Sequence, residues 1–122
     1  MIDYEALLAK YCADNQELLH ILLTHSRQVA NRALAILRLH PEWMERGEVD
    51  PVFVEEAAML HDIGVVLCNA PKIHCMGTHA YIEHGYLGAE ILRQEGLPKH
   101  AHIAERHTGT GITMEQIVRE QL

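Results

Sequence analysis

The sequence predicts an all-α protein, a single bundle of five to six helices within 122 residues. Apolar residues recur at helical spacing along most of the chain, and no segment alternates apolar and polar residues as a half-buried strand does. Capping and helix-ending residues divide this pattern into helices of ordinary length. Because 48% of the residues are hydrophobic, one core can form without disulfide bonds. We therefore expect one domain over residues 1–122.

The first half of the chain is predicted to form three helices. They cover residues 3–13, 15–39 and 51–64. Asn15 is a favourable cap for the second helix, and Pro41 stops that helix. Residues 41–50 are expected to form a loop or short turn, after which Pro51 is well placed as the first residue of the third helix. Gly64 is expected to end the third helix.

The second half of the chain is predicted to form three further helices. They cover residues 78–95, 98–107 and 113–122. Gly96 closes the first of them and Pro98 begins the next. Residues 65–77 have an irregular pattern and are long enough to be a functional loop. The last helix is marginal unless it docks, so we expect it to pack on the core or the domain to continue beyond Leu122.

The charge distribution bears on the class of partner. The net charge is −7, from 10 basic and 17 acidic residues, and the basic residues are scattered along the chain. Duplex nucleic acid is bound by clustered Lys and Arg, so we do not expect it as a partner. A small phosphorylated substrate remains compatible, because a metal ion can supply the positive charge locally.

The cysteines and the hydropathy pattern bear on the compartment. Cys12, Cys68 and Cys75 are an odd number, form no CxxC pair and follow no apolar leader, which favours the cytoplasm. No apolar run approaches the roughly 20 residues that cross a bilayer, so no membrane association is expected. A homo-oligomer is left open.

Four histidines continue the apolar faces of the predicted helices: His25, His61, His84 and His107. His25 lies between Leu22 and Val29 on its stripe and is expected to point inward. A buried polar group without a partner costs about 1–3 kcal/mol, so four such imidazoles would remove much of a domain's stability. Histidines that converge on a carboxylate are typical of a metal site. A metal-free bundle with structural histidine hydrogen bonds is the disfavoured alternative.

The carboxylate is expected from Asp62, directly after His61. Neighbouring residues on a regular helix point about 100° apart, so both reach one ion only where the helix ends or the ion lies between them. Gly64 is expected to end the helix at this place. The His-Asp pair at a helix terminus is therefore a more specific indication of a metal site than the dipeptide alone.

The set His25, His61-Asp62-Ile63-Gly64, His84 and His107 resembles the HD-domain superfamily of metal-dependent phosphohydrolases, in its HDIG subset. The likeness extends over residues 18–111, and the run HGYLGAEIL from His84 is similar to the HxxxGxxIL run of the binuclear members. The resemblance implies a helical bundle in which His25, His61 and Asp62 bind one ion. By position, His84 and His107 match the two additional histidines that hold a second ion.

Two departures from the family pattern affect the expected activity. No aspartate follows Asp62, although the family has a final aspartate ligand, and Glu115 and Glu120 are the carboxylates beyond His107. We therefore expect the HD domain over residues 1–122 to be truncated, lacking its C-terminal helix or helices. Residues 105–112 read ERHTGTGI, whereas enzymes that cleave cyclic dinucleotides carry HHExxDGxGYP, so a cyclic dinucleotide is a disfavoured substrate.

The resemblance implies hydrolysis of a small phosphomonoester, phosphodiester or nucleotide by a metal-activated water. Asp62 and His61 are the expected catalytic residues. One or two divalent or iron-type ions are the expected cofactors, with iron, manganese, nickel, zinc and magnesium not distinguished. The alternative function is a catalytically incomplete HD-like module that binds a metal or a nucleotide and regulates.

Several residues beside the expected ligands are candidates for contact with substrate. Those proposed to bind the phosphate are Lys72, Arg106, Thr108 and Thr110. Three others lie in or just after the loop: His74, Cys75 and His79. Their simpler interpretation is a segment that packs over the site without contributing ligands.

Overall fold

The computed structural model describes residues 1–47 and 49–106, and most of this part of the chain is α-helical. The helices are α1 (Tyr4–Cys12), α2 (Gln16–Leu39), α3 (Pro41–Glu45), α4 (Pro51–Leu60), α5 (His84–Gln94) and α6 (Pro98–Arg106). The all-α prediction is confirmed.

The starts of the first long helices are fixed by side-chain caps. Asp3 accepts a hydrogen bond from the amide of Ala6 at 3.0 Å, and Asn15 accepts one from Leu18 at 3.2 Å. Asp50 caps α4 in the same way and is followed by Pro51 at the first helical position. These side chains satisfy amides that have no partner within the helix, which is why each helix begins where it does.

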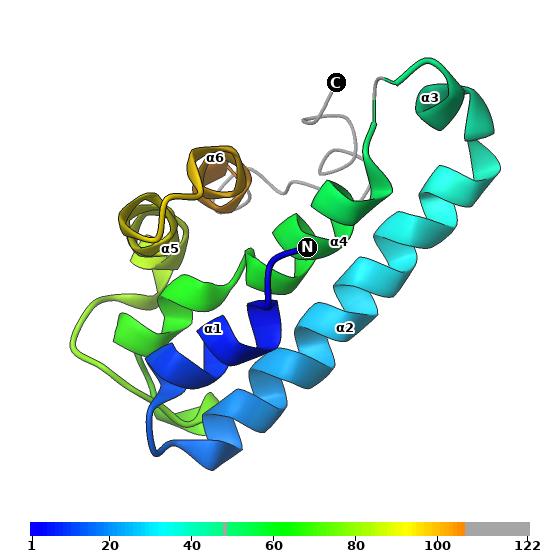
Figure 1. Ribbon diagram of the computed structural model, residues 1–122. Helices are drawn as coiled ribbons and strands as arrows, with labels where there is room; N and C mark the ends of the chain where they lie inside the picture. Colours follow the sequence, from blue (N-terminus) through cyan, green and yellow to red (C-terminus); the bar gives the residue numbers. More distant parts are fainter. Residues whose placement is uncertain (48, 107–122) are drawn as a thin grey trace.

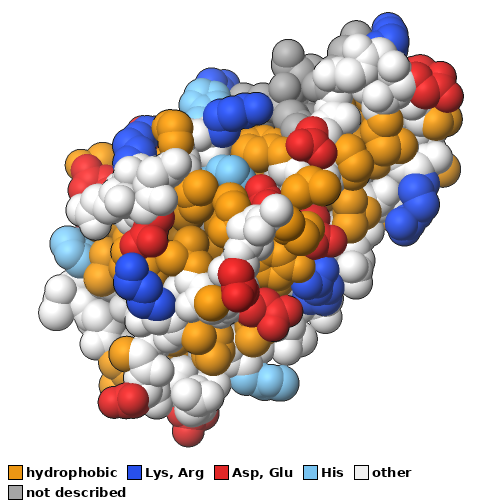
Figure 2. Space-filling model, viewed as in Figure 1, with side chains coloured by type: hydrophobic (Ala, Val, Ile, Leu, Met, Phe, Trp, Pro, Cys, Tyr) orange, Lys and Arg blue, Asp and Glu red, His pale blue; other side chains and the backbone are white. Residues whose placement is uncertain are grey.

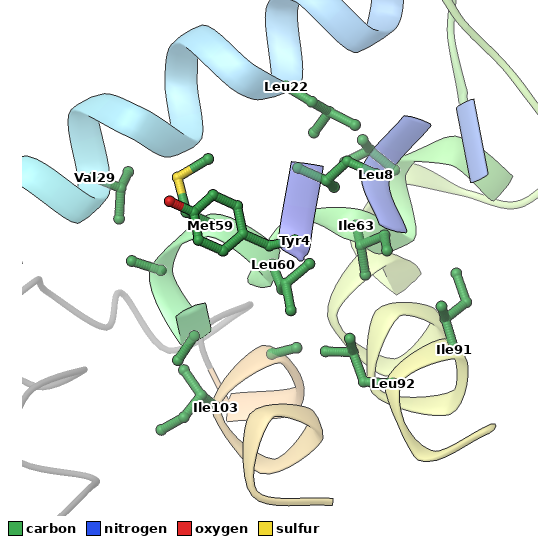
Figure 3. Close-up of a cluster of buried hydrophobic side chains, with 14 of the residues drawn as sticks. Tyr4, Leu8, Leu22, Val29, Met59, Leu60, Ile63, Ile91, Leu92 and Ile103 are labelled. Carbon is green, nitrogen blue, oxygen red and sulfur yellow. The ribbon is translucent and has the colours of Figure 1, made fainter. Parts of the chain in front are cut away.

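The helices form layers around α4, as Figure 1 shows. The long helix α2 runs alongside α1 and α4, and α5 and α6 pack against each other on the other side of α4. Buried side chains from α1, α2, α4, α5 and α6 meet in one core (Figure 3). Those labelled there include Leu8, Leu22, Leu60, Ile63 and Leu92. The site described below lies at the carboxyl end of α4, where this core reaches α5.

A segment of short elements connects α4 to α5. They are the 3-10 helix η1 (Ile63–Leu67), strand β1 (Asn69–Ala70), the 3-10 helix η2 (Pro71–Ile73), strand β2 (Cys75–Met76) and the 3-10 helix η3 (Tyr81–Glu83). The two strands pair antiparallel, with Asn69 opposite Met76. Each strand has two residues, which is too short to produce an alternating pattern in the sequence. The side-chain amide of Asn15 donates to the carbonyl of His74 at 2.7 Å and holds this segment against the start of α2.

Some predicted helix boundaries are wrong. The third helix ends at Leu60 instead of Gly64, and the fourth begins at His84 instead of residue 78. The segment predicted as a loop or short turn contains the one-turn helix α3. The predicted helix over residues 113–122 lies outside the described residues.

Charged side chains of both signs are interspersed on the face shown in Figure 2, with hydrophobic side chains between them. On this face, Lys and Arg do not gather into one patch. Within residues 1–47 and 49–106, no helix has the length and apolar character needed to cross a membrane.

Candidate functional site

The site begins where α4 ends. Leu60 is the last residue of the helix, and Asp62 has φ −103° and ψ 12°, so the chain has left the helical path at the carboxylate. The Asp62 Oδ2 atom lies 3.3 Å from His61 Nε2. The end of the helix thus lets two adjacent side chains meet at one point, which a regular helix would prevent.

Two glycines bring α5 to this turn. A Cβ atom on Gly64 would lie 1.9 Å from the carbonyl oxygen of His84 and 2.5 Å from the amide nitrogen of Gly88. A Cβ on Gly88 would in turn lie 3.1 Å from the amide nitrogen of Gly64. The two backbones therefore touch, and only glycine at position 64 permits this approach. Because of it, the first residue of α5, His84, lies beside Asp62.

Asp62 is the centre of the cluster. Its Oδ2 atom lies 3.1 Å from His25 Nε2 and 3.3 Å from His61 Nε2, and its Oδ1 atom lies 3.2 Å from His84 Nε2. The three histidines come from α2, the end of α4 and the start of α5. The side chains of His61 and His84 are buried, and that of Asp62 is 12% exposed. Residues far apart in the sequence thus present nitrogen and oxygen atoms to one small volume.

Backbone carbonyls orient two of these imidazoles. His61 Nδ1 lies 2.5 Å from the carbonyl oxygen of Ala58, and His84 Nδ1 lies 2.7 Å from that of Tyr81. A carbonyl oxygen only accepts, so each Nδ1 carries the proton and donates it. In the neutral rings, Nε2 then carries a lone pair directed at the Asp62 carboxylate. Acceptors that face one another in this way require a cation between them or an added proton on the ring.

The carboxylate also changes the proton affinity of its neighbours. The hydrogen bond to Asp62 raises the pKa of His25 above its usual value, against an opposing effect of desolvation. For His84, desolvation lowers the pKa, but the bonds to Asp62 and to the Tyr81 carbonyl together outweigh it and raise the pKa. Both shifts have the same physical cause, a negative charge that favours a positive partner. The cluster therefore attracts cations.

The donor set fits a divalent ion. The ligand atoms of His25, His61 and Asp62 lie within 4.8 Å of one another, so this cluster is positioned to bind one ion. Imidazole nitrogen and carboxylate oxygen suit zinc, iron, manganese and nickel. Hydrogen bonds from Nδ1 to fixed carbonyls are the usual way in which proteins orient metal-binding histidines. His84 faces the other carboxylate oxygen, Oδ1, and stands outside this set of three.

The predicted inward orientation of His25 is wrong in one respect. Its side chain is 51% exposed, although it faces Asp62. The position on the helix face is as expected, but α2 leaves this face open toward solvent next to a cavity. The argument that a buried imidazole needs a partner therefore holds for His61 and His84, whose side chains are buried. It does not hold for His25.

The other predicted site residues lie apart from the cluster or beyond the described chain. Lys72 is exposed on η2, and Arg106 is exposed at the last position of α6. Neither lines the cavity beside Asp62. His107, Thr108 and Thr110 lie outside the described residues.

The loop residues do not join the ligand atoms. His74 is exposed, and His79 is exposed with its Nδ1 atom 3.2 Å from Glu83 Oε2. Cys75 is buried, and burial raises the pKa of its thiol to about 11. The cluster of three possible ligands contains none of them.

Sequence reasoning missed the supporting residues. The carbonyls of Ala58 and Tyr81 orient the histidines three positions further along the chain, and backbone atoms leave no signature in residue type. It also missed a buried pair in which His100 Nε2 lies 3.0 Å from Glu56 Oε1. His100 lies three residues before the buried Ile103, a spacing that places both on one helix face, so this histidine had a detectable signal.

A cavity of about 230 Å³ opens beside the cluster. It is lined by Leu18, Ile21, Leu22, His25, Asp62, Val65, Ile73 and Tyr81. His25 and Asp62 belong both to the cluster and to the cavity wall. A small molecule in the cavity would therefore touch the candidate ligands.

Comparison with known proteins gives one family and several relatives. The family described as HD domain matches residues 22–122. An uncharacterized protein of Methanocaldococcus jannaschii is 47% identical over 72 residues, which are 58% of this chain and 36% of that protein. The tRNA (cytidine(56)-2'-O)-methyltransferase of Thermoplasma volcanium is 32% identical over 114 residues, 93% of this chain and 27% of that enzyme. That of Picrophilus torridus is 30% identical over 112 residues, 89% of this chain and 30% of that enzyme.

The chain spans between 27% and 36% of the length of these curated relatives. No solved structure matches it significantly. The matched family region contains His25, His61, Asp62 and His84.

Proposed function

The chain belongs to the HD-domain family, and from this membership we propose that it is a metal-dependent phosphohydrolase. In this proposal His25, His61 and Asp62 hold an ion. The substrate is a small phosphomonoester, phosphodiester or nucleotide. The observation that carries the proposal is the Asp62 carboxylate, faced by the Nε2 atoms of two histidines whose Nδ1 protons are held by backbone carbonyls.

The proposed mechanism assigns separate roles to the bound ion, to His61 and His84, and to Asp62. A bound ion would lower the pKa of a coordinated water and neutralise the phosphate. The carbonyls of Ala58 and Tyr81 keep the Nε2 atoms of His61 and His84 unprotonated in the neutral rings. In this proposal Asp62, which lines the cavity, accepts a hydrogen bond from the attacking water and orients it toward phosphorus.

The two oxygens of Asp62 favour a site for more than one ion. Oδ2 faces His25 and His61, whereas Oδ1 faces His84. A carboxylate with ligands on both sides can bridge two ions, as in two-metal hydrolytic sites. We propose that His84 belongs to the second position, with His107 as its expected companion. Lys72, Arg106 and Thr108 remain our candidates for contact with the phosphate.

A binding module without turnover is the second candidate. One observation favours it: the matched region is 27–30% of two proteins that are named as tRNA methyltransferases. In that case the ion would hold a nucleotide or a phosphate without hydrolysis. A domain of this kind could serve a partner that modifies RNA.

Hydrolysis of 4-nitrophenyl phosphate and bis(4-nitrophenyl) phosphate, after separate loading with manganese, iron, nickel and zinc, tests the first candidate. The matched variants are His25→Gln and His20→Gln, because both histidines are exposed on α2 and only His25 belongs to the cluster. We expect His25→Gln to lower kcat/KM by at least about tenfold, an effect seen even for residues that only support a metal ligand. We expect His20→Gln to retain wild-type activity.

The outcomes separate the two candidates. Equal activity in the two variants would reject the catalytic assignment of the cluster. Stoichiometric metal binding without hydrolysis of either ester, under every metal, would favour the binding module.

A further inference from the structure

Most of the side chains that line the cavity beside the cluster are apolar. From α2 it receives Leu18, Ile21, Leu22 and His25, which follow one another at the spacing of a single helix face. From the segment between α4 and α5 it receives Val65, Ile73 and Tyr81. The polar side-chain groups of the wall belong to His25, Asp62 and the hydroxyl of Tyr81, and the other lining residues are aliphatic.

Hydrogen bonds and close backbone contacts hold the cavity wall opposite α2 in place. Asn15 at the start of α2 donates to the carbonyl of His74 at 2.7 Å, next to Ile73. A Cβ atom on Gly77 would lie 2.2 Å from the carbonyl carbon of Leu67, so the residue that follows β2 packs directly on the end of η1. The amide of Gly77 also donates to the carbonyl of Cys68 at 2.8 Å. A fixed wall of this kind can select a ligand by shape.

The chemistry of the wall excludes several kinds of ligand. No Lys or Arg is among the lining residues that the structure describes, so the charges of a polyphosphate would have no partner there besides an ion. A nucleobase has polar edges, and each polar group left unpaired costs about 1–3 kcal/mol. An alkyl or aryl group has no such groups and gains from leaving water.

Tyr81 links the wall to the cluster. Its ring lies 4.5 Å, between centroids, from the ring of His84, and its carbonyl accepts the His84 Nδ1 proton. The ring also lines the cavity, so one residue contacts both the proposed ligand and a histidine of the site. An aromatic side chain in this place favours a flat or apolar group on the substrate.

Resting on the proposed function, we propose that the substrate is a single phosphate esterified to a small alkyl or aryl group. The phosphate lies at His25 and Asp62, and the apolar group occupies the cavity against Ile21, Ile73 and Tyr81. Ile21 and Ile73 are specificity-determining residues in this arrangement, because they contact the group that distinguishes one phosphate ester from another.

Binding of two phosphonates tests this proposal without turnover, because their carbon–phosphorus bond is not hydrolysed. Benzylphosphonate and methylphosphonate share the anionic group and differ in the apolar group. Isothermal titration calorimetry would measure the Kd of each with the manganese-loaded protein. We expect benzylphosphonate to bind about tenfold more tightly, since its ring is buried in the cavity.

Matched variants assign the preference to the cavity. Ile21→Gln places an amide in the wall and should reduce the preference to about equal binding, while Leu39→Gln on the same helix should leave it unchanged. Leu39 is 76% exposed and lies outside the cavity wall. Ile73→Gln is the second cavity variant and makes the test independent of any folding defect in Ile21→Gln.

Each result bears on the proposal. Loss of the preference in either folded cavity variant supports it. A preference that survives both substitutions, equal or absent binding of the two phosphonates by the wild-type protein, or equally good competition by adenosine monophosphate would overturn it.

The two proposals fail in different ways. Hydrolysis of simple phosphate esters without a benzyl preference would overturn the substrate class and leave the phosphohydrolase. A benzyl preference that Ile21→Gln removes, in a protein that hydrolyses no ester, would support the cavity and reject the phosphohydrolase.

Discussion

Two clusters along α4 pair histidine with a buried or nearly buried carboxylate, and they differ in what the imidazoles face. At the end of the helix, Asp62 is approached by three histidines and opens onto a cavity. In the middle, Glu56 is approached by His100 at 3.0 Å and by the amide of Ile2 at 2.7 Å. Each carboxylate oxygen of Glu56 therefore faces a nitrogen donor of the protein.

What the imidazole nitrogens face distinguishes a candidate ligand from a structural histidine. His61 and His84 donate Nδ1 protons to carbonyls, so their Nε2 lone pairs meet a carboxylate and require a cation or an added proton on the ring. His100 uses Nε2 toward Glu56, and its buried Nδ1 has no hydrogen-bond partner among the described residues. When His100 Nε2 donates, the Glu56 carboxylate has a donor at each oxygen without an ion. Orientation and access to a cavity, and not burial alone, therefore mark the Asp62 cluster.

The largest effect is expected from Asp62→Asn. An amide cannot supply the negative charge that an ion needs, so we expect kcat/KM for an aryl phosphate to fall by at least about a hundredfold, the upper end for residues that support a metal. The exposed Asp14→Asn is the matched control. Activity of Asp62→Asn near that of Asp14→Asn would remove the functional distinction between the two clusters.

Gly64→Ala should disturb the Asp62 cluster through the backbone. The new methyl group would overlap the carbonyl oxygen of His84, so η1 and α5 must separate. We expect a loss of about 1–3 kcal/mol in the free energy of unfolding, as for other overpacked sites, together with weaker metal binding. Urea denaturation and metal titration measure both effects. Unchanged stability and affinity would show that the close approach does not position His84.

Glu56→Gln should lower the stability of the protein without lowering metal binding or activity, in contrast to Asp62→Asn. Replacing the carboxylate weakens its contacts with the His100 ring and the Ile2 amide, so we expect the free energy of unfolding to fall by about 1–3 kcal/mol. Metal content and kcat/KM of the folded protein should remain at wild-type levels. Glu17→Gln, an exposed carboxylate on α2, controls for loss of charge. A Glu56→Gln variant that loses its metal would contradict the structural role.

The smallest effect is expected at a partly exposed carboxylate that also has protein donors. Glu95 accepts hydrogen bonds from Tyr11 at 2.7 Å and Lys10 at 2.9 Å, and these contacts lower its pKa. A lowered pKa in the folded state stabilises the protein above the unfolded pKa, and this contribution is lost as the pH falls through the folded pKa. Thermal melts should show a small advantage of wild type over Glu95→Gln at pH 7. That advantage should begin to shrink as the pH falls below the ordinary Glu pKa of about 4.3, and a difference that does not shrink there would contradict the assignment.

The helical class was predictable from the sequence because its signals are local. Asp3, Asn15 and Asp50 cap helices within three residues of themselves, and Pro51 begins α4 as expected. The predicted helix end at Gly64 was wrong because a glycine after a helix can either end that helix or permit close contact with another segment. Here it permits contact between two backbones that are distant in the sequence, and that contact is decided by tertiary packing.

The proximity of His25, His61, Asp62 and His84 could be predicted from the sequence, but their exposure to solvent could not. Helical phase placed His25, His61 and His84 toward one another, and Asp62 lies near all three. Phase gives a direction around the helix and not the distance to solvent, so the exposure of His25 was missed. The apolar cavity was also beyond the sequence, because Ile21 and Ile73 become neighbours only when the segment after α4 folds against α2.

The central claim is that the Asp62 cluster binds an ion and the Glu56 pair does not. Metal content of wild type, Asp62→Asn and Glu56→Gln, measured by elemental analysis after expression with added manganese, iron, nickel and zinc, tests it most directly. We expect at least about one ion per chain in wild type and Glu56→Gln, and a content near zero in Asp62→Asn. Equal metal content in wild type and Asp62→Asn, or none in wild type, would contradict it.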